Sequence, residues 1–313
     1  MPPKILVVSG PTASGKTRLA VELALAHNGE VVSADSMQIY RRMDIGTAKP
    51  TPEEMRGVPH HMIDVADPEE DFSVARYVDL AARCVDDILA RGKLPILAGG
   101  TGLYIDSLLS GRTFAHFDEQ SPLRGELEER MRAEGGQALL EELGKVDPDS
   151  AARLHPNDEK RIVRALEVYY STGKTITQHN AETKAIPPRY EALTLTLAFS
   201  HREDMWARID QRVDEMMAAG LVQEVEDLLQ SGVPQRCTAM QAIGYKEMAA
   251  ALLGSGDTAA AAEEIKLRSR QYAKRQLTWF RRNGAAKWLY WDRVPDFAAA
   301  LQASTGSMKE FGI

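Results

Sequence analysis

The feature that most constrains the fold of this chain is a phosphate-binding loop near its start. Residues Gly10–Thr17 match the pattern G-x-x-x-x-G-K-[ST] in full. The apolar run Ile5–Val8 before the loop predicts a buried strand, and a helical pattern follows to about His27. In that order, backbone N–H groups, a helix N-terminus and the Lys16 ammonium surround a phosphate. We therefore expect a diphosphate or triphosphate to bind at Gly10, Pro11, Thr12, Ala13, Ser14, Gly15, Lys16 and Thr17.

The Thr17 hydroxyl is the predicted protein ligand of a Mg²⁺ ion on the phosphates. A glycine-rich turn without a ligand would leave Lys16 and Thr17 unexplained.

A candidate catalytic acid follows the second predicted strand. Val31–Ser33 predicts a short strand, and Asp35 follows its end, at the edge where ligands of open α/β sheets bind. An aspartate there can accept a proton from an incoming nucleophile, and an N-cap for the next turn is the alternative. The predicted strand Leu94–Ala98 ends in Gly99–Gly102 without the second acid that P-loop hydrolases usually carry. The placement favours group transfer to an acceptor over nucleotide hydrolysis.

Composition and cysteine usage exclude several classes of protein. The chain has 313 residues, no apolar run of membrane-spanning length, and an N-terminus that leads directly into a strand without a signal peptide. Cys84 and Cys237 lie far apart, so neither a disulfide framework nor a zinc module is indicated. We expect a cytoplasmic protein. Nothing in the sequence requires an oligomer larger than a monomer, and no obligate protein partner is expected. The net charge of −7 means that any nucleic-acid binding must be local.

A basic segment near the end of the chain is the candidate for such binding. Ile265–Trp291 contains eight Lys or Arg residues and no Asp or Glu. On a helix, Arg268, Tyr272, Arg275 and Trp279 fall on one stripe, which suits a phosphate backbone with unstacked bases nearby. The alternative is a solvated helix whose apolar residues are simply core.

The pattern of elements predicts an α/β fold: a P-loop parallel sheet core with helices on both faces and an inserted all-helical subdomain. We assign residues 1–114 and 186–313 to the core with its C-terminal basic helix, and 115–185 to the insertion. The insertion is wholly helical in pattern from Asp118 to Thr172, and it contains His155–Asp158 as a turn and cap. Alternation over Leu193–Phe199 returns the chain to the sheet.

Two pairs of residues have competing interpretations. Arg208 and Arg212 lie one helical turn apart and can close over the phosphates, or they form a surface pair bonded to Asp204 or Asp210. His60-His61 lacks the spacing of a metal pair, so we expect loop or packing histidines.

A series of segments, in order over roughly residues 4–291, resembles the tRNA dimethylallyltransferase family. They are Gly10–Thr17, Asp35–Tyr40, Met43–Pro50, Gly99–Tyr104, His155–Asp158 with Arg161 and Arg164, Gln241–Lys246, and Arg270–Gln276 with Thr278–Arg281. The resemblance implies transfer of a dimethylallyl group from dimethylallyl diphosphate to the exocyclic amine of the adenine beside the anticodon of certain tRNAs. The chain stops without the zinc module of eukaryotic relatives, so it resembles the bacterial type.

The resemblance also implies roles for single residues. Asp35 would take the proton of the amine, Thr101 would line the channel between the two substrates, and Arg212, with Arg208 behind it, would meet the diphosphate. The tRNA anticodon stem-loop would contact Asp35, Ser36, Met37, Gln38, Thr101, Arg124, Lys160, Arg161, Arg164, Gln241, Gly244, Tyr245, Lys246, Arg270, Gln271, Lys274, Arg275 and Trp279. Gln38 is expected at an adenine edge. Gln241 departs from the arginine of many relatives, which weakens its assignment.

Three other functions share part of this pattern. A small-molecule P-loop kinase would use Lys16, Thr17 and Asp35 but would not need the basic helix. An isopentenyltransferase acting on free adenine nucleotides would keep the diphosphate chemistry and lose the tRNA contacts. A pure RNA-binding module would need neither Lys16 nor Asp35.

Overall fold

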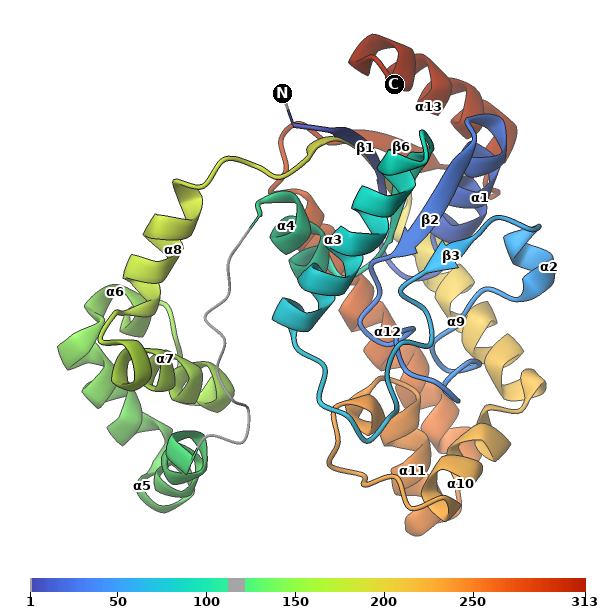
Figure 1. The fold of residues 1–313 in the computed structure, drawn as a ribbon. Helices are drawn as coiled ribbons and strands as arrows, with labels where there is room; N and C mark the ends of the chain where they lie inside the picture. Colours follow the sequence, from blue (N-terminus) through green and yellow to red (C-terminus); the bar gives the residue numbers. More distant parts are fainter. Residues whose placement is uncertain (1, 112–121) are drawn as a thin grey trace. The chain divides into compact units, whose positions relative to one another are not determined.

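A parallel sheet positions the predicted phosphate loop and the predicted acid at one edge. The computed structural model describes residues 2–111 and 122–313. In that part of the chain, six parallel strands follow the order β3-β2-β4-β1-β5-β6 (Figure 1). Their bounds are β1 Lys4–Ser9, β2 Gly29–Ser33, β3 His60–His61, β4 Leu94–Gly99, β5 Glu191–Phe199 and β6 Lys287–Trp291. Because parallel strands end at the same edge, the segments after β1, β2 and β4 meet there.

Contacts divide the chain into two units. One unit comprises Met1–Leu109 and Arg189–Ile313, and the other comprises Ser110–Pro188. The predicted boundary at 114/115 and the start of the predicted helical pattern at Asp118 lie outside the described residues. The predicted return to the core at residue 186 lies within three residues of Arg189.

The helices of the first unit cover both faces of the sheet. The unit contains α1 Lys16–Ala26, α2 Pro52–Met55, α3 Val74–Ala90, α4 Gly102–Leu109, α9 Arg202–Ala219, α10 Leu221–Gln230, the 3-10 helix Ala239–Gln241, α11 Tyr245–Leu253, α12 Thr258–Phe280 and α13 Phe297–Phe311. Of these, α10 and α11 pack mainly on α9 and α12. Helices α1 and α13 share one apolar cluster with the sheet, whereas α3 and α4 lie on the opposite face (Figure 1).

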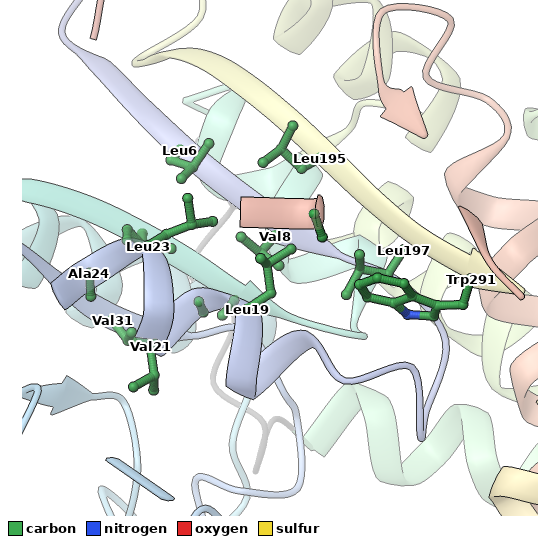
Figure 2. Packing of buried hydrophobic residues seen from close by; sticks show 14 of the residues in the cluster. Leu6, Val8, Leu19, Val21, Leu23, Ala24, Val31, Leu195, Leu197 and Trp291 are labelled. Carbon is green, nitrogen blue, oxygen red and sulfur yellow. The ribbon is translucent and has the colours of Figure 1, made fainter. Parts of the chain in front are cut away.

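Helix α1 is held by an apolar stripe that begins one turn after the phosphate loop. Leu19 and Leu23 are fully buried and pack against Leu6 and Val8 of β1 and Leu195 of β5 (Figure 2). Burial of this stripe fixes the helix axis, and hence the direction in which its N-terminus points.

Helix α3 is tied to the other face by a buried tyrosine. The Tyr77 hydroxyl donates to the Ser33 carbonyl oxygen at 3.0 Å, and its ring stacks on Tyr104 of α4 at 3.9 Å between centroids. These contacts hold the ends of β2 and β4, from which Asp35 and Thr101 follow.

The second unit is helical and has a core of its own. It contains α5 Pro122–Val146, α6 Pro148–Ala151, α7 Glu159–Thr172 and α8 Ile176–Lys184. Its buried side chains include Leu139 and Leu143 of α5 and Ile162 and Leu166 of α7. Helix α5 bends at Gly135, whose φ of 84° favours glycine.

Several elements differ from the sequence-based prediction. The edge strands β3 and β6 were not predicted, because two-residue and mixed-polarity strands give weak periodicity. Helix α13 was not predicted either. His60 and His61 form β3 rather than a loop, and the His61 imidazole lies 2.8 Å from the buried Glu30 carboxylate, which fits the packing alternative of the prediction. The basic helix ends at Phe280, and Lys287 lies in β6, paired with Glu310.

No helix among the described residues is long and apolar enough to cross a membrane.

Candidate functional site

The loop between β1 and α1 has the geometry of an anion cradle. Gly10 and Gly15 have φ values of 150° and 82°, and a Cβ would lie 2.6 Å from the Leu197 oxygen at Gly10 and 2.7 Å from the Phe297 ring at Gly15. No side chain caps the N-terminus of α1, so its first N–H groups stay available to a ligand. The Ser14 hydroxyl is buried and has no hydrogen-bond partner among the described residues. An anion with several oxygens would satisfy these donors.

Segments from the C-terminal part of the chain brace the loop from outside. The Trp291 indole N–H donates to the Ser14 carbonyl oxygen at 2.8 Å, and the Gln276 amide oxygen accepts from the Thr12 N–H at 2.9 Å. The Phe297 ring lies against Gly15, with the Arg18 guanidinium 4.2 Å from its centroid. The phosphate motif alone gave no signal for these braces.

Lys16 and Arg212 form a cationic pair at the loop. Burial, followed by the nearby Arg212 charge, lowers the pKa of Lys16 to about 8, and Asp35 opposes that shift. Burial also lowers the pKa of Arg212, again opposed by Asp35. Lys16 donates to the Pro11 carbonyl oxygen at 2.8 Å, whereas Arg208 is exposed and donates to Gln211 at 3.2 Å. The three charged groups Lys16, Arg212 and Asp35 therefore lie close enough to interact. A bound anion would offset the electrostatic repulsion between the two cations.

Asp35 and Thr101 are joined through the backbone at the ends of β2 and β4. Asp35 Oδ1 accepts from the Met37 N–H at 2.9 Å, as the turn-capping alternative requires. Thr101 Oγ1 accepts from the Ser36 N–H at 3.0 Å, and the Thr101 N–H donates to the Ala34 oxygen at 3.0 Å. The hydrogen bond within the turn does not separate Asp35 from the site, because the Asp35 charge still acts on the pKa values of Lys16 and Arg212.

Tyr272 of α12 lies at the same place. Burial, and then the Asp35 charge, raises the pKa of Tyr272 to about 12, while hydrogen bonds with Thr101 and Gln276 oppose the rise. The basic helix thus reaches the edge of the sheet with an aromatic hydroxyl as well as with cations.

Gln38 is engaged within the protein. Its Oε1 accepts from the Ser33 hydroxyl at 3.0 Å, and its Nε2 donates to the Ala48 oxygen at 3.1 Å. The side chain is partly buried between β2 and the loop that follows. A contact with an adenine edge stays a prediction and would have to coexist with these bonds or replace them.

Glu224 of α10 is a residue that sequence reasoning missed. Its carboxylate accepts from the backbone N–H groups of Asp44, Ile45 and Gly46 at 2.8, 2.8 and 3.0 Å. It also accepts from the Tyr245 hydroxyl at 2.5 Å. Glutamate in an amphipathic helix is indistinguishable from a solvent-exposed residue by sequence, so no local signal identified it.

Tyr245 is fully buried, so its side chain is absent from any surface that RNA can reach in this structure. Its ring packs on Gly46, where a Cβ would lie 2.5 Å away. Its neighbours differ: Gln241 and Lys246 are exposed, and Gly244, with φ of 102°, begins α11. The structure thus gives the Tyr245 side chain a packing role, and a tRNA contact at this position stays a prediction.

The cations of α12 divide into paired and exposed groups. Arg270 is bonded to Asp210 of α9 at 2.7 Å, and Lys266 is bonded to Asp214 of the same helix at 2.7 Å. The acids absent from the basic run are thus supplied by α9 and by the preceding turn of α12, where Glu263 pairs with Lys266 and Glu264 with Arg268. Exposed residues on α12 include Gln271, Lys274 and Arg275.

The aromatic residues of α12 also have partners. The Arg275 guanidinium lies 5.6 Å from the Tyr272 ring centroid. The Trp279 indole N–H donates to Asp106 at 2.9 Å, and its ring fills the space beside Gly102. Trp279 therefore packs α12 onto α4, whatever further contact it makes.

In the helical unit, two of the predicted tRNA contacts neutralise a buried acid. Arg124 and Arg164 bind the fully buried Glu167 carboxylate at 2.8 and 2.7 Å. Lys160 and Arg161 are exposed, and Arg161 lies 3.2 Å from Asp158. Of the predicted tRNA contacts in the helical unit, Lys160 and Arg161 are therefore the ones whose side chains are most accessible to a polyanion.

A magnesium ion would have to depend mainly on the bound phosphates. Within residues 2–111 and 122–313, no group of three or more His, Cys, Asp or Glu residues is placed to hold a metal. Thr17 lies in the first turn of α1 and is partly buried, next to the cradle. A hydroxyl there with phosphate oxygens and water is a donor set that suits Mg²⁺.

Comparisons with known proteins agree on one family. Residues 38–283 match the family model described as IPP transferase. The chain is 48% identical over 309 residues to the tRNA dimethylallyltransferase of Geobacter sulfurreducens, covering 99% of this chain and 97% of that protein. It is 47% identical over 295 residues to the tRNA dimethylallyltransferase of a Thermoanaerobacter species, covering 94% of each.

A solved structure gives the same result. The full-length tRNA isopentenylpyrophosphate transferase of Bacillus halodurans is 42% identical to this chain and has a TM-score of 0.72. The match covers 98% of this chain and 97% of that one. The family model spans most of the sequence and the relatives exceed 40% identity over nearly their whole lengths, so the chain belongs to the IPP transferase family.

Proposed function

We propose that this protein transfers a dimethylallyl group from dimethylallyl diphosphate to the exocyclic amine of the adenine 3′-adjacent to the anticodon of tRNA, releasing diphosphate. The observation that carries the proposal is the meeting of Asp35 with Lys16 and Arg212 beside an uncapped helix N-terminus. A base for an amine and a site for a diphosphate leaving group are thus adjacent. Membership of the family supplies the substrate class.

The reaction needs a base because an aromatic amine is a weak nucleophile. As the adenine nitrogen forms its bond to the allylic carbon, the carbon–oxygen bond to diphosphate breaks. Asp35 takes the proton that the nitrogen loses, and the loop N–H groups, Lys16 and Arg212 receive the charge that the diphosphate gains. Preorganised donors of this kind typically contribute ~3 kcal/mol each to a transition state. Thr101 accepts from the Ser36 N–H next to Asp35, which supports its proposed role in lining the channel between the two substrates.

Magnesium is the proposed cofactor. Bound at Thr17 and the diphosphate oxygens, it would neutralise negative charge on the leaving group. Lys16 and Arg212 hold the same anion from the protein side. Burial lowers the pKa of both groups, and a bound anion would stabilise their charged forms.

The tRNA anticodon stem-loop is proposed to contact the exposed cationic and polar residues of α12 and of the helical unit. Gln271, Lys274 and Arg275 on α12 and Lys160 and Arg161 on α7 are exposed. Phosphate contacts by such residues would help to offset the few kcal/mol needed to unstack the target base. We propose that the protein acts as a monomer in the cytoplasm, where tRNA is available.

A single assay tests the function. Purified protein, magnesium and radiolabelled dimethylallyl diphosphate are incubated with unmodified tRNA whose anticodon is followed by adenine. Label in the RNA that disappears with Asp35→Asn supports the proposal. Label on free adenosine monophosphate, or phosphate released from ATP, would refute it in favour of a small-molecule enzyme.

A further inference from the structure

A buried glutamine on α12 joins the two loops that carry the predicted chemistry. Gln276 is 6% exposed, and both ends of its amide group are used. Its Oε1 accepts from the Thr12 N–H at 2.9 Å, and its Nε2 donates to the Gly100 carbonyl oxygen at 3.0 Å. One side chain therefore bonds the phosphate loop after β1 and the turn after β4.

The turn after β4 is shaped for this contact. A Cβ at Gly100 would lie 2.3 Å from Gln276 Nε2, so only glycine permits the approach. Thr101 follows directly and holds the Ser36 N–H beside Asp35. The position of Gln276 thus bears on the diphosphate loop directly and on the Asp35 turn through Thr101.

The position is unusual for the face of α12 that it occupies. Its neighbours one turn away, Ala273 and Phe280, are buried and apolar, and the helical period predicts an apolar residue at 276 as well. An apolar side chain there would leave the Gly100 oxygen buried without its donor. Glutamine offers an acceptor and a donor on one planar group, which no apolar or acidic residue reproduces at neutral pH.

We propose that Gln276 is a positioning residue for the diphosphate site, which orients the phosphate loop through Thr12 and the Thr101 turn through Gly100. The inference rests on the proposed use of this loop for a diphosphate. It assigns to the basic helix a second task besides contact with RNA, since Arg275, the preceding residue, is exposed. The phosphate cradle is thereby built partly by a residue more than 250 positions away in sequence.

Calorimetric titration of the full-length protein with inorganic diphosphate, with magnesium present, tests the inference without any need for turnover. Gln276→Met keeps the length of the side chain and removes its hydrogen bonds to Thr12 and Gly100, together with the one that it makes with Tyr272. We expect diphosphate to bind roughly tenfold more weakly, as for the loss of a buried hydrogen-bonded pair. The Kd for tRNA should stay within about twofold of that of the unchanged protein, because Gln276 is buried. In turnover, KM for dimethylallyl diphosphate should rise more than kcat falls.

Gln276→Glu provides a readout that a purely structural role would not give. A protonated glutamic acid can donate to Gly100 and accept from Thr12, whereas its carboxylate cannot donate and repels diphosphate. Burial raises the pKa of such an acid, so the loss relative to unchanged protein at the same pH should be larger at pH ~8 than at pH ~6. An equal loss at both pH values would overturn the positioning role. The same holds for unchanged diphosphate binding in both variants.

Gln302→Met is the matched control, because Gln302 is exposed on α13 and should leave diphosphate binding unchanged. Should Gln276→Met melt below the assay temperature, Gln276→Glu alone decides, through the ratio of its loss of diphosphate affinity at pH ~8 to that at pH ~6. Diphosphate binding without prenyl transfer to tRNA by the unchanged protein would refute the proposed function, and the Gln276 ratios would still decide this inference.

Discussion

Replacing Lys16 with methionine is expected to stabilise the ligand-free protein and to abolish its binding of diphosphate. Lys16 has a pKa of about 8 in the folded chain against an ordinary value of 10.5. Its folded-state pKa is thus lowered, so at pH 7 the charged lysine destabilises the fold. That cost decreases as pH rises from about 8 to 10.5, where the unfolded chain binds more protons.

The size of the effect follows from the shift. A pKa lowered from 10.5 to about 8 corresponds to about 3 kcal/mol, an upper value because Lys16 keeps partial contact with water. Loss of the hydrogen bond to the Pro11 oxygen at 2.8 Å returns ~1 kcal/mol. Lys16→Met should therefore stabilise the protein by about 2 kcal/mol at pH 7, or roughly 4 °C in Tm for a chain of this size.

Calorimetric and urea unfolding of the two proteins without ligand measure this gain, and titration with diphosphate measures the lost affinity. The gain should decrease above pH ~8, reach zero near pH ~10, and turn into a loss of up to ~1 kcal/mol above pH ~10.5, where only the lost hydrogen bond remains. Lys309→Met, on an exposed lysine of α13, should change stability by less than about 0.5 kcal/mol. A Lys16→Met protein that is less stable than its parent at pH 7 would refute the burial argument. So would a gain that is independent of pH.

Three further changes test other parts of the site and fold. Asp35→Asn should lower kcat by roughly 10²- to 10⁴-fold with little effect on the tRNA Kd measured by filter binding, because the amide cannot accept the proton; a large loss of tRNA affinity would instead make Asp35 an RNA contact. Arg275→Ala should reduce the salt dependence of tRNA binding by about one unit of slope, and Arg270→Ala by less, because Asp210 already pairs with Arg270; equal slopes for the two variants would contradict this division. Glu30→Gln should destabilise the fold by about 1–3 kcal/mol at pH 7, because Arg91 and Lys93 lose a charged acceptor but keep partial contact with water.

The Glu30 prediction also has a defined pH dependence. Hydrogen bonding to Arg91 holds the pKa of Glu30 well below its usual range, against the opposing effect of burial. Its stabilising contribution is therefore present above about pH 4.5 and is lost as pH falls through the lowered folded-state pKa. Urea unfolding across pH should show the wild-type advantage shrinking in acid; a constant difference down to low pH would contradict the ion-pair argument.

Local sequence was sufficient where a function depends on neighbouring residues. The phosphate loop needs two glycines in positive-φ positions and a helix that starts at Lys16, and all of these lie within one short segment. The parallel sheet and the helical insertion follow from periodicity of apolar residues over longer windows. Asp35 was predicted as a site residue because the carboxyl end of a parallel strand marks the ligand edge.

The tertiary structure decided which charges are free to act. Arg270 and Arg275 are equivalent in the sequence pattern, yet α9 supplies Asp210 to one of them and leaves the other exposed. Tyr245 belongs to a motif that suggests function, and packing on Gly46 buries it.

The contacts that the sequence did not predict join residues that lie far apart in the chain. Gln276 bonds to Thr12 and Gly100, and Glu224 holds three consecutive N–H groups of a distant loop. The sequence by itself determined the local chemistry of this protein, because backbone conformation and strand polarity are set by residues close in the chain. Only the tertiary structure decided how those groups are charged, braced and exposed, because burial and electrostatic pairing depend on side chains that sequence distance does not reveal.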